Sequence, residues 1–154
     1  MPAAEIAALL AGAKASLVAK SCPGQLVLGA DQILTLDGQR FAKPADPAAA
    51  RTQLRAFAGR THELHSAVAV VQDATTLFQH ADTARLTMRS FSDEFLDRYL
   101  DLVGAAVTAS VGAYQLEGLG IHLFERIEGD HFTILGLPLL ELLAFLRSER
   151  LLGI

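Results

Sequence analysis

The sequence predicts a single α/β domain built on a mixed sheet. Helix-type and strand-type patterns alternate along the 154 residues, as they do in proteins whose helices cover a sheet. Hydrophobic residues make up 51% of the chain and charged residues 19%, so its body is too apolar to remain disordered. A chain of this length can bury a core without disulfides or a structural metal, and no repeat or low-complexity linker divides residues 1–154.

The first expected elements are a helix and a strand with a short return arm. Residues 3–20 are rich in Ala, Leu and Lys, and a Pro-Gly turn ends this helix. Residues 25–36 are apolar with β-branched side chains, which predicts a mostly buried strand that is interrupted at Gly29-Ala30-Asp31. Asp37-Gly38 predicts a tight turn that leads into a short antiparallel strand over residues 39–41.

The middle of the chain is expected to hold a capped helix and two strands. Asp46 is placed to cap a helix whose first residue is Pro47, and Gly59 ends that helix. Residues 61–72 have the apolar composition of a buried strand. Residues 84–91 alternate between apolar and polar side chains, which predicts a half-exposed strand.

The last third of the chain is expected to begin and end with helices. Ser92-Asp93-Glu94 caps a helix that runs to about Val103, with acidic residues where the helix dipole favours them. Residues 121–127 and 132–135 read as strands. Pro138 begins a final amphipathic helix whose leucines recur at helical spacing.

Charge and composition exclude several classes of function. The formal net charge is −4, so the chain lacks the basic surface that dominates nucleic-acid affinity. The one cysteine cannot form an internal disulfide, which favours a cytoplasmic location. The longest uncharged stretch, residues 102–116, is too short to span a membrane. The mean hydropathy of +0.33 is high, and we expect some apolar surface to meet a partner, such as a second copy in a homodimer, or a missing part of the domain.

Asp31 is the first candidate functional residue, because it interrupts an otherwise apolar strand. A buried carboxylate costs several kcal/mol unless it is paired, binds a metal or lies at a strand end. Lys43 precedes Pro44 in an extended segment, where a lysine is more often simply solvated. Residues 110–120 carry three glycines among apolar side chains, which fits either a ligand loop or a bent loop in the core.

His62 and His65 do not predict a metal site. On a strand, residues three apart face opposite sides, so the two imidazoles cannot share an ion without a bulge. We therefore assign both to the sheet and the surface.

Several groups of residues occur in a characteristic order between Ala11 and Arg147. They are Ala11-Gly12-Ala13-Lys14-Ala15, Leu28-Gly29-Ala30-Asp31-Gln32, Leu36-Asp37-Gly38 with Lys43-Pro44, Gly59-Arg60-Thr61-His62-Glu63, Gly112-Ala113-Tyr114, Glu117-Gly118-Leu119-Gly120, Phe124-Glu125-Arg126-Ile127-Glu128-Gly129-Asp130 and Gly136-Leu137-Pro138-Leu139. In this order and spacing they resemble the Maf family of nucleoside triphosphate pyrophosphatases.

The resemblance implies hydrolysis of a nucleoside triphosphate to the monophosphate and pyrophosphate with a divalent metal such as Mg²⁺ or Mn²⁺. It also implies an elongated α/β sandwich with a cleft for the nucleotide. Asp31 would be the catalytic carboxylate, activating water or holding the metal, and Lys14 and Lys43 would neutralise phosphate charge. Phosphoryl transfer depends mostly on positioning and charge neutralisation, so this division of roles is chemically reasonable.

The chain departs from the family pattern at its amino terminus. The family begins with a strand and a Ser-x-Ser-Pro-Arg-Arg loop that binds phosphates, followed by a helix, whereas this chain starts at the next helix. We therefore expect an amino-terminally truncated domain that hydrolyses nucleotides poorly, because two lysines do not replace a bidentate arginine pair. The alternative function is an impaired remnant that binds nucleotides or dimerises.

Three positions bear on substrate preference. Where family branches that act on dTTP and UTP usually carry threonine, lysine and glutamine, this chain has Gln32, Ser110 and Glu117. The glutamine and glutamate resemble the branch that prefers 7-methyl-GTP. The exchanges at Ser110 and Glu117 also make the site more negative by two charges, which suits a cationic base. The alternative is drift in a lineage whose site has lost its function.

Overall fold

The computed structural model describes all of residues 1–154, which form two compact units. The first unit comprises Met1–Gln32, His65–Thr83 and Gly129–Ile154, and the second comprises Ile33–Leu64 and Ala84–Glu128. The prediction that these residues make one domain stays a prediction. None of the helices is long and apolar enough to cross a bilayer.

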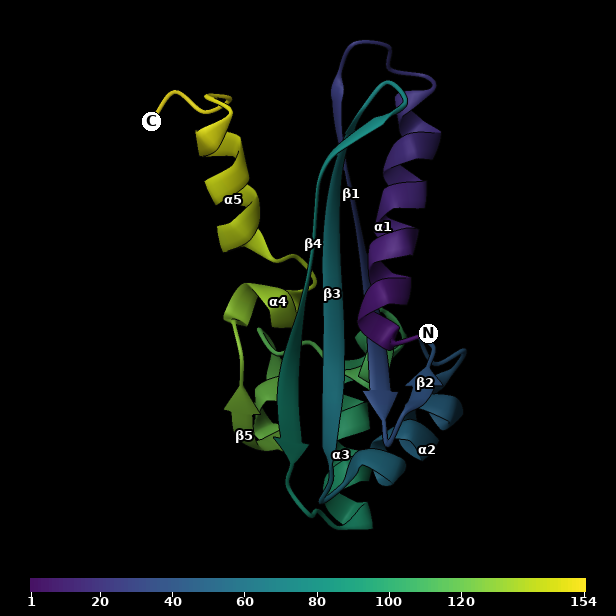
Figure 1. The fold of residues 1–154 in the computed structure, drawn as a ribbon. Coiled ribbons are helices and arrows are strands. Elements are labelled where there is room, and N and C mark those ends of the chain that lie inside the picture. Colours follow the sequence, from purple (N-terminus) through teal and green to yellow (C-terminus); the bar gives the residue numbers. More distant parts are fainter. The chain divides into compact units, whose positions relative to one another are not determined.

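Five α-helices and five strands alternate along the chain, with 3-10 helices between α3 and β5 (Figure 1). They are α1 (Ala3–Ala19), β1 (Leu26–Leu36), β2 (Gln39–Phe41), α2 (Pro47–Phe57), β3 (Thr61–Gln72), β4 (Thr75–Met88), α3 (Asp93–Val103), η1 (Gly104–Thr108), η2 (Val111–Ala113), η3 (Leu119–Leu123), β5 (Phe124–Glu128), α4 (His131–Leu135) and α5 (Leu139–Ser148). The strand order in the sheet is β2-β1-β3-β4-β5.

The α/β class is confirmed, but the strand directions differ from the mixed sheet that was expected. β1 pairs antiparallel with β2, and β4 pairs antiparallel with β5. Strands β3 and β4 are neighbours joined by only Asp73 and Ala74, and a connection this short permits antiparallel pairing alone. Short hairpin turns, such as Asp37-Gly38 between β1 and β2, therefore replace the longer crossovers that parallel strands need.

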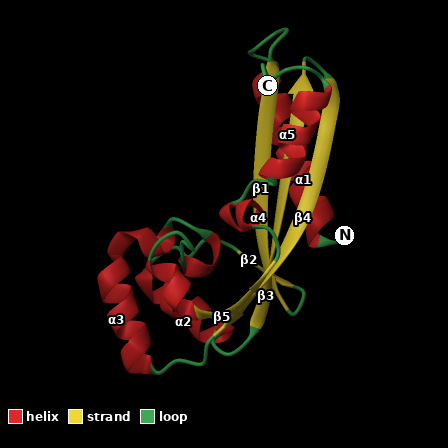
Figure 2. Cartoon of the chain, turned by 90° about the vertical axis from the view of Figure 1, so that its left-hand side faces the viewer, coloured by secondary structure: helices red, strands yellow, loops and turns green.

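In the first unit, α1 and α5 cover opposite faces of the long strands (Figures 1 and 2). Val71 of β3 packs with Ala15 and Ala19 of α1, while the neighbouring Val70 packs with Leu142 of α5. Successive side chains of a strand point to opposite faces, so one strand serves both helices. The second unit has its own core, in which large side chains of α2, β4 and α3 are fully buried: Leu54, Phe57, Leu86, Met88 and Leu96.

Most of the helices predicted from capping signals are confirmed. Asp46 caps α2 by accepting a hydrogen bond from the Ala49 backbone N–H at 2.7 Å, and Pro47 is the first helical residue. Ser92 caps α3 by accepting one from Phe95 at 3.2 Å. Both capping signals act within one helical turn, and tertiary packing does not override them.

Several boundary predictions were wrong. β1 is continuous through residues 29–31, and β4 begins nine residues before the predicted start at residue 84. The strand predicted over residues 121–127 is confirmed from Phe124 onward as β5, but residues 121–123 belong to the 3-10 helix η3. Residues 132–135 belong to the helix α4, because Asp130 caps the backbone N–H groups of Phe132 and Thr133 and Gly136 ends the turn at φ 111°.

Candidate active site

The first unit brings together two of the predicted site residues, Asp31 and Lys14. Asp31 lies on β1 with its side chain 14% exposed, and Lys14 lies on α1 with its side chain 58% exposed. The Lys14 ammonium donates to Asp31 Oδ1 at 2.5 Å and to the Ala30 carbonyl at 3.1 Å. The carboxylate that interrupts the apolar strand is therefore paired, and its partner stays accessible to solvent.

A glycine in β1 makes this pairing possible. A Cβ atom at Gly29 would lie 2.3 Å from the Ala11 carbonyl oxygen and 2.8 Å from the Ala15 backbone nitrogen, both on α1. The face of α1 that packs against the sheet consists of small residues that are at most 2% exposed: Ala7, Ala11, Ala15 and Ala19. Small side chains on both elements let the helix backbone approach the strand, and this close approach sets Lys14 beside Asp31.

Gln32, the next residue of β1, faces the other side of the strand. Its amide nitrogen donates to Ser66 Oγ at 2.9 Å and to the carbonyls of Thr133 and Ile134 at 3.2 and 3.0 Å. Ser66 in turn donates to the Thr133 carbonyl at 2.6 Å. The Gln32 amide nitrogen thus holds α4 in place.

The second unit holds the other predicted residues. Lys43 is exposed and lies between β2 and α2, and the preceding Ala42 carbonyl accepts a hydrogen bond from Gln53 at 2.9 Å. Ser110 and Glu117 lie seven positions apart around the 3-10 helix η2. Glu117 is exposed, and Ser110 Oγ accepts a hydrogen bond from Gln115 at 3.0 Å.

We call residues 110–120 the glycine loop. Gly112 and Ala113 adopt φ values of 83° and 64°, and a Cβ at Gly112 would lie 2.7 Å from the Tyr114 ring and 2.8 Å from Leu34. A Cβ at Gly120 would lie 2.4 Å from the Gln115 carbonyl. The loop is therefore folded tightly on itself, and glycine is required at both positions.

His62 contacts this loop and is buried, and His65 is only 8% exposed, which corrects the assignment of both histidines to the surface. His62 belongs to β3 as expected, but it is 0% exposed, and its Nε2 lies 2.7 Å from the Tyr114 hydroxyl. Its ring packs against Phe57 with a centroid distance of 5.2 Å, and Phe124 lies 5.9 Å away. The signal in the sequence was its position two residues before Leu64, which places both side chains on the same buried face.

Burial perturbs the titration of three groups near the glycine loop. It lowers the pKa of His62 to about 4, because the protonated imidazole would lose its hydration. It raises the pKa of Tyr99 to about 12 and that of Tyr114 further above the ordinary range. All three side chains are therefore neutral at pH 7.

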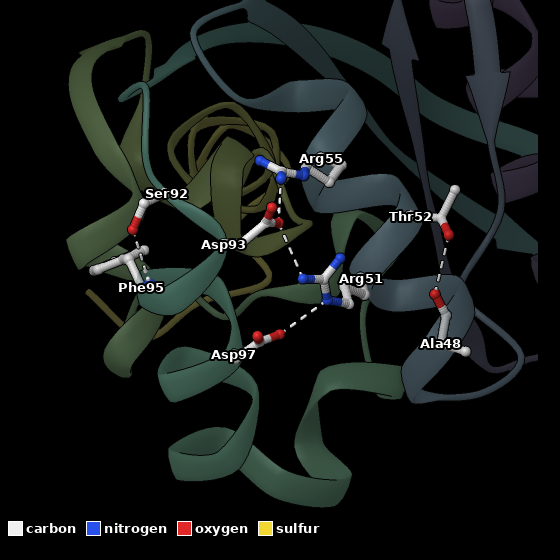
Figure 3. Close-up of polar contacts among 8 residues, drawn as sticks. All are labelled: Ala48, Arg51, Thr52, Arg55, Ser92, Asp93, Phe95 and Asp97. Atoms are coloured by element: carbon white, nitrogen blue, oxygen red, sulfur yellow. Dashed lines mark hydrogen bonds and ion pairs between the residues drawn. The ribbon is translucent and has the colours of Figure 1, made fainter.

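An ion-pair network joins α2 to α3 in the second unit (Figure 3). Arg51 reaches Asp93 at 3.0 Å and Asp97 at 2.9 Å, and Arg55 also pairs with Asp93. The two arginines and the two aspartates are each four positions apart, so each pair lies on one helix face. The pKa of Arg51 is raised by its hydrogen bond to Asp97.

Two pockets of the second unit are lined by none of the predicted site residues. A polar pocket of about 260 Å³ is lined by Thr35, Asp37, Gly38, Thr61, Glu63 and Arg85. An apolar pocket of about 160 Å³ is lined by Phe95, Arg98, Tyr99, Leu102, Leu119 and His122.

Asp31 is the residue predicted to hold a metal ion. No group of three His, Cys, Asp or Glu side chains in residues 1–154 is arranged to hold a metal ion. Mg²⁺ in nucleotide-binding sites is often bound by one or two carboxylates together with substrate phosphates. Lys14 contacts Oδ1 of Asp31, which leaves Oδ2 for a second cation, so the carboxylate fits as the single protein ligand of such an ion.

The comparisons with known proteins indicate one family over nearly the whole chain. A family model described as Maf-like protein matches residues 1–149. A protein of Rhodopseudomonas palustris CGA009, named nucleoside triphosphate pyrophosphatase, is 61% identical over 150 residues, which cover 97% of this chain and 74% of that protein. Proteins with the same name from Nitrobacter winogradskyi and Paramagnetospirillum magneticum are 59% and 56% identical, covering 99% and 95% of this chain and 75% of each relative.

Proposed function

Because this chain belongs to the Maf family, we propose that it hydrolyses a nucleoside triphosphate to the nucleoside monophosphate and pyrophosphate. The observation that carries the proposal is the pairing of Asp31 with Lys14 at 2.5 Å on adjacent elements. Phosphoryl transfer needs a group that activates water and cations that neutralise the phosphate oxygens. A carboxylate next to a half-exposed ammonium supplies both.

In the proposed reaction, water attacks phosphorus and one bond of the bridge between the α- and β-phosphates breaks. Asp31 orients the water and takes its proton, and the bridging oxygen leaves with one of the two products. Lys14 and Lys43 bind phosphate oxygens and stabilise the charge that develops on them. Where a divalent ion such as Mg²⁺ or Mn²⁺ is bound, Asp31 would instead be its protein ligand, and the ion would supply further charge neutralisation.

We further propose that the base is a guanine carrying a positive charge, as in 7-methyl-GTP. Glu117 is exposed, and its carboxylate can accept hydrogen bonds from N1 and the exocyclic amine of guanine. Ser110 contributes by the absence of the positive charge that a lysine would place there. Gln32 contributes indirectly, by holding α4 through the Thr133 and Ile134 carbonyls.

Product analysis tests the proposed activity. The chain is incubated with Mg²⁺ or Mn²⁺ and, separately, 7-methyl-GTP, GTP, dTTP or UTP. We expect the monophosphate and pyrophosphate in equal amounts, with 7-methyl-GTP consumed fastest. A diphosphate with inorganic phosphate would contradict the proposed bond cleavage, and faster turnover of dTTP or UTP would contradict the proposed base.

A second protein sample tests the expectation that the family's phosphate-binding arginines are missing from this chain. A version of the chain that carries a relative's Ser-x-Ser-Pro-Arg-Arg segment ahead of Met1 is assayed in parallel. We expect the 154-residue chain to be slow and the extended chain to be faster. Absence of pyrophosphate from both samples, with nucleotide binding retained, would favour the alternative of a binding module.

Association and location complete the proposal. We propose a cytoplasmic protein that forms a homodimer, supported by apolar side chains on α1 that are 43–67% exposed: Leu9, Leu10 and Leu17. Size-exclusion chromatography with light scattering tests the dimer, and a monomer across the micromolar range would contradict it.

A further inference from the structure

The pair formed by His62 and Tyr114 is the feature of the second unit that packing explains least. The two side chains are 0% and 4% exposed, and their polar atoms are 2.7 Å apart. The His62 Nδ1 atom is buried without a hydrogen-bond partner. Aromatic rings surround the pair, with Phe124 at a centroid distance of 4.8 Å from Tyr114 and Phe57 stacked on His62.

Either tautomer of His62 leaves a buried polar hydrogen unpaired. If Tyr114 donates to Nε2, the hydrogen lies on Nδ1 and has no acceptor; if Nε2–H donates, the tyrosine hydroxyl hydrogen has none. Replacing both partners by apolar rings of similar shape removes this penalty and is often neutral or stabilising. A contribution to core stability therefore does not explain why a histidine occupies this position. A buried polar group without a hydrogen-bond partner needs a different explanation.

The backbone next to Tyr114 is strained and needs side chains to hold it in place. Ala113, a residue with a side chain, sits at φ 64°, a strained conformation that persists only where neighbouring contacts determine it fully. The Tyr99 hydroxyl donates to the Ala113 carbonyl at 3.2 Å, and His62 holds the adjacent Tyr114 ring. Two side-chain hydrogen bonds therefore hold consecutive residues in the middle of the glycine loop.

We propose that His62 is a positioning residue that, by its hydrogen bond to Tyr114, fixes the glycine loop and thereby the placement of Ser110 and Glu117 toward the nucleotide base. The placement toward the base rests on the proposed function, whereas the fixing of the loop does not. His62 acts through Tyr114 and contacts no substrate atom.

Hydrogen exchange of the glycine loop tests the proposal without any nucleotide. The variants are Tyr114→Phe, which removes one oxygen, His62→Phe, and His62→Gln, whose amide can still bond to the Tyr114 hydroxyl. The reporters are the Ala113 and Gly118 amides, which donate within the loop to Ser110 and Gln115. Leu86→Val is the control, because this fully buried residue of β4 contributes packing alone.

We expect Tyr114→Phe and His62→Phe to speed exchange of the reporter amides about tenfold while amides of α2 and α3 stay protected, the signature of local opening. His62→Gln should return the reporters toward the wild-type rate, and Leu86→Val should raise exchange throughout the second unit. Unchanged reporters in Tyr114→Phe, a rise spread evenly over the unit, or no rescue by glutamine would each overturn the proposal. Tyr114→Phe keeps the test decisive even if His62→Phe fails to fold.

Kinetics then test the link to substrate selection. We expect His62→Phe to lower the ratio of kcat/KM for 7-methyl-GTP to that for dTTP several-fold, with a smaller change in kcat for the better substrate, and His62→Gln to restore it. A uniform loss on both nucleotides would overturn the link to the base. If neither the 154-residue chain nor the extended chain hydrolyses nucleotides, the proposed function fails, and the exchange measurements still decide whether His62 fixes the loop.

Discussion

Two pairs of polar side chains, one in each unit, differ in their exposure to solvent and in their charge. In the first unit, Lys14 and Asp31 form an ion pair whose lysine is more than half exposed. In the second unit, His62 and Tyr114 are buried among aromatic rings and are uncharged at pH 7. An open pair can exchange its partner for a substrate phosphate, whereas a buried pair can only hold its neighbours. The contrast suggests that the Lys14–Asp31 pair serves the chemistry and that the His62–Tyr114 pair serves selection of the base.

The largest expected effect is on the pH dependence of stability in the second unit. Folding lowers the pKa of His62 from 6.5 to about 4, so between these values the unfolded chain binds a proton that the native state does not. The contribution of the neutral, buried His62 to the free energy of unfolding is fully present above pH 6.5. It is lost as the pH falls toward 4, by about 3 kcal/mol for a pKa shift of this size. His62→Phe should remove this part of the acid destabilisation.

Tyrosine fluorescence during urea unfolding measures that effect selectively. The chain has two tyrosines and no tryptophan, and both tyrosines, Tyr99 and Tyr114, lie in the second unit. The comparison is between wild type and His62→Phe at pH 7.5 and 4.5. Equal losses of stability in the two proteins would contradict the buried neutral histidine.

In the first unit, Asp31→Asn in the extended chain is expected to reduce pyrophosphate release by at least about a hundredfold, as expected for loss of a principal catalytic group. The asparagine keeps the shape of the side chain but cannot take the proton from water. The matched control is Glu5→Gln, which removes an exposed acid of α1 and should leave the rate unchanged. Turnover near the wild-type rate in Asp31→Asn would show that the ion pair takes no part in catalysis.

Gly29→Ala tests how the first pair is built. The new Cβ would lie 2.3 Å from the Ala11 carbonyl, so α1 must move away from β1. We expect a loss of about 2 kcal/mol in the free energy of unfolding, typical of overpacking, together with faster hydrogen exchange in α1. Gly153→Ala, whose Cβ meets nothing within 4 Å, is the control and should change neither quantity. An undisturbed α1 in Gly29→Ala would contradict the close approach.

The smallest expected effect concerns the ion pairs between α2 and α3. Arg51→Met removes contacts to Asp93 and Asp97, but the arginine side chain is 38% exposed, so solvent screens these pairs and we expect only a small loss in the free energy of unfolding. The loss should shrink further in 1 M salt. Urea midpoints at two salt concentrations measure it, with the exposed Arg40→Met as the control. A large, salt-independent loss would mean that Arg51 does more than join two helices.

Sequence reasoning succeeded where the signals were local. Asp46, Pro47 and Ser92 act within one helical turn, and their caps were predicted correctly. Asp31 was noticed because an acid interrupts an apolar strand. By contrast, Asp130 was not recognised as a cap, so α4 was read as a strand.

Long-range pairs escaped prediction. The His62 partner lies 52 residues away in the chain, and the Gln32 partners in α4 lie about a hundred residues away. No periodicity records such contacts, because they depend on how separate elements pack. The resemblance pointed to Lys14 as a phosphate ligand, but its pairing with Asp31 became visible only with α1 packed on β1.

The most direct test of this division of roles is a measurement of kcat/KM for 7-methyl-GTP and dTTP in the extended chain, as wild type and with Asp31→Asn or Glu117→Gln. Asp31→Asn is predicted to lower both values by about the same hundredfold and leave their ratio unchanged. Glu117→Gln is predicted to lower the ratio while dTTP is still hydrolysed at least as fast as by the wild type. An unchanged ratio in Glu117→Gln, or a near wild-type rate in Asp31→Asn, would contradict the assignment of selection and chemistry to these two residues.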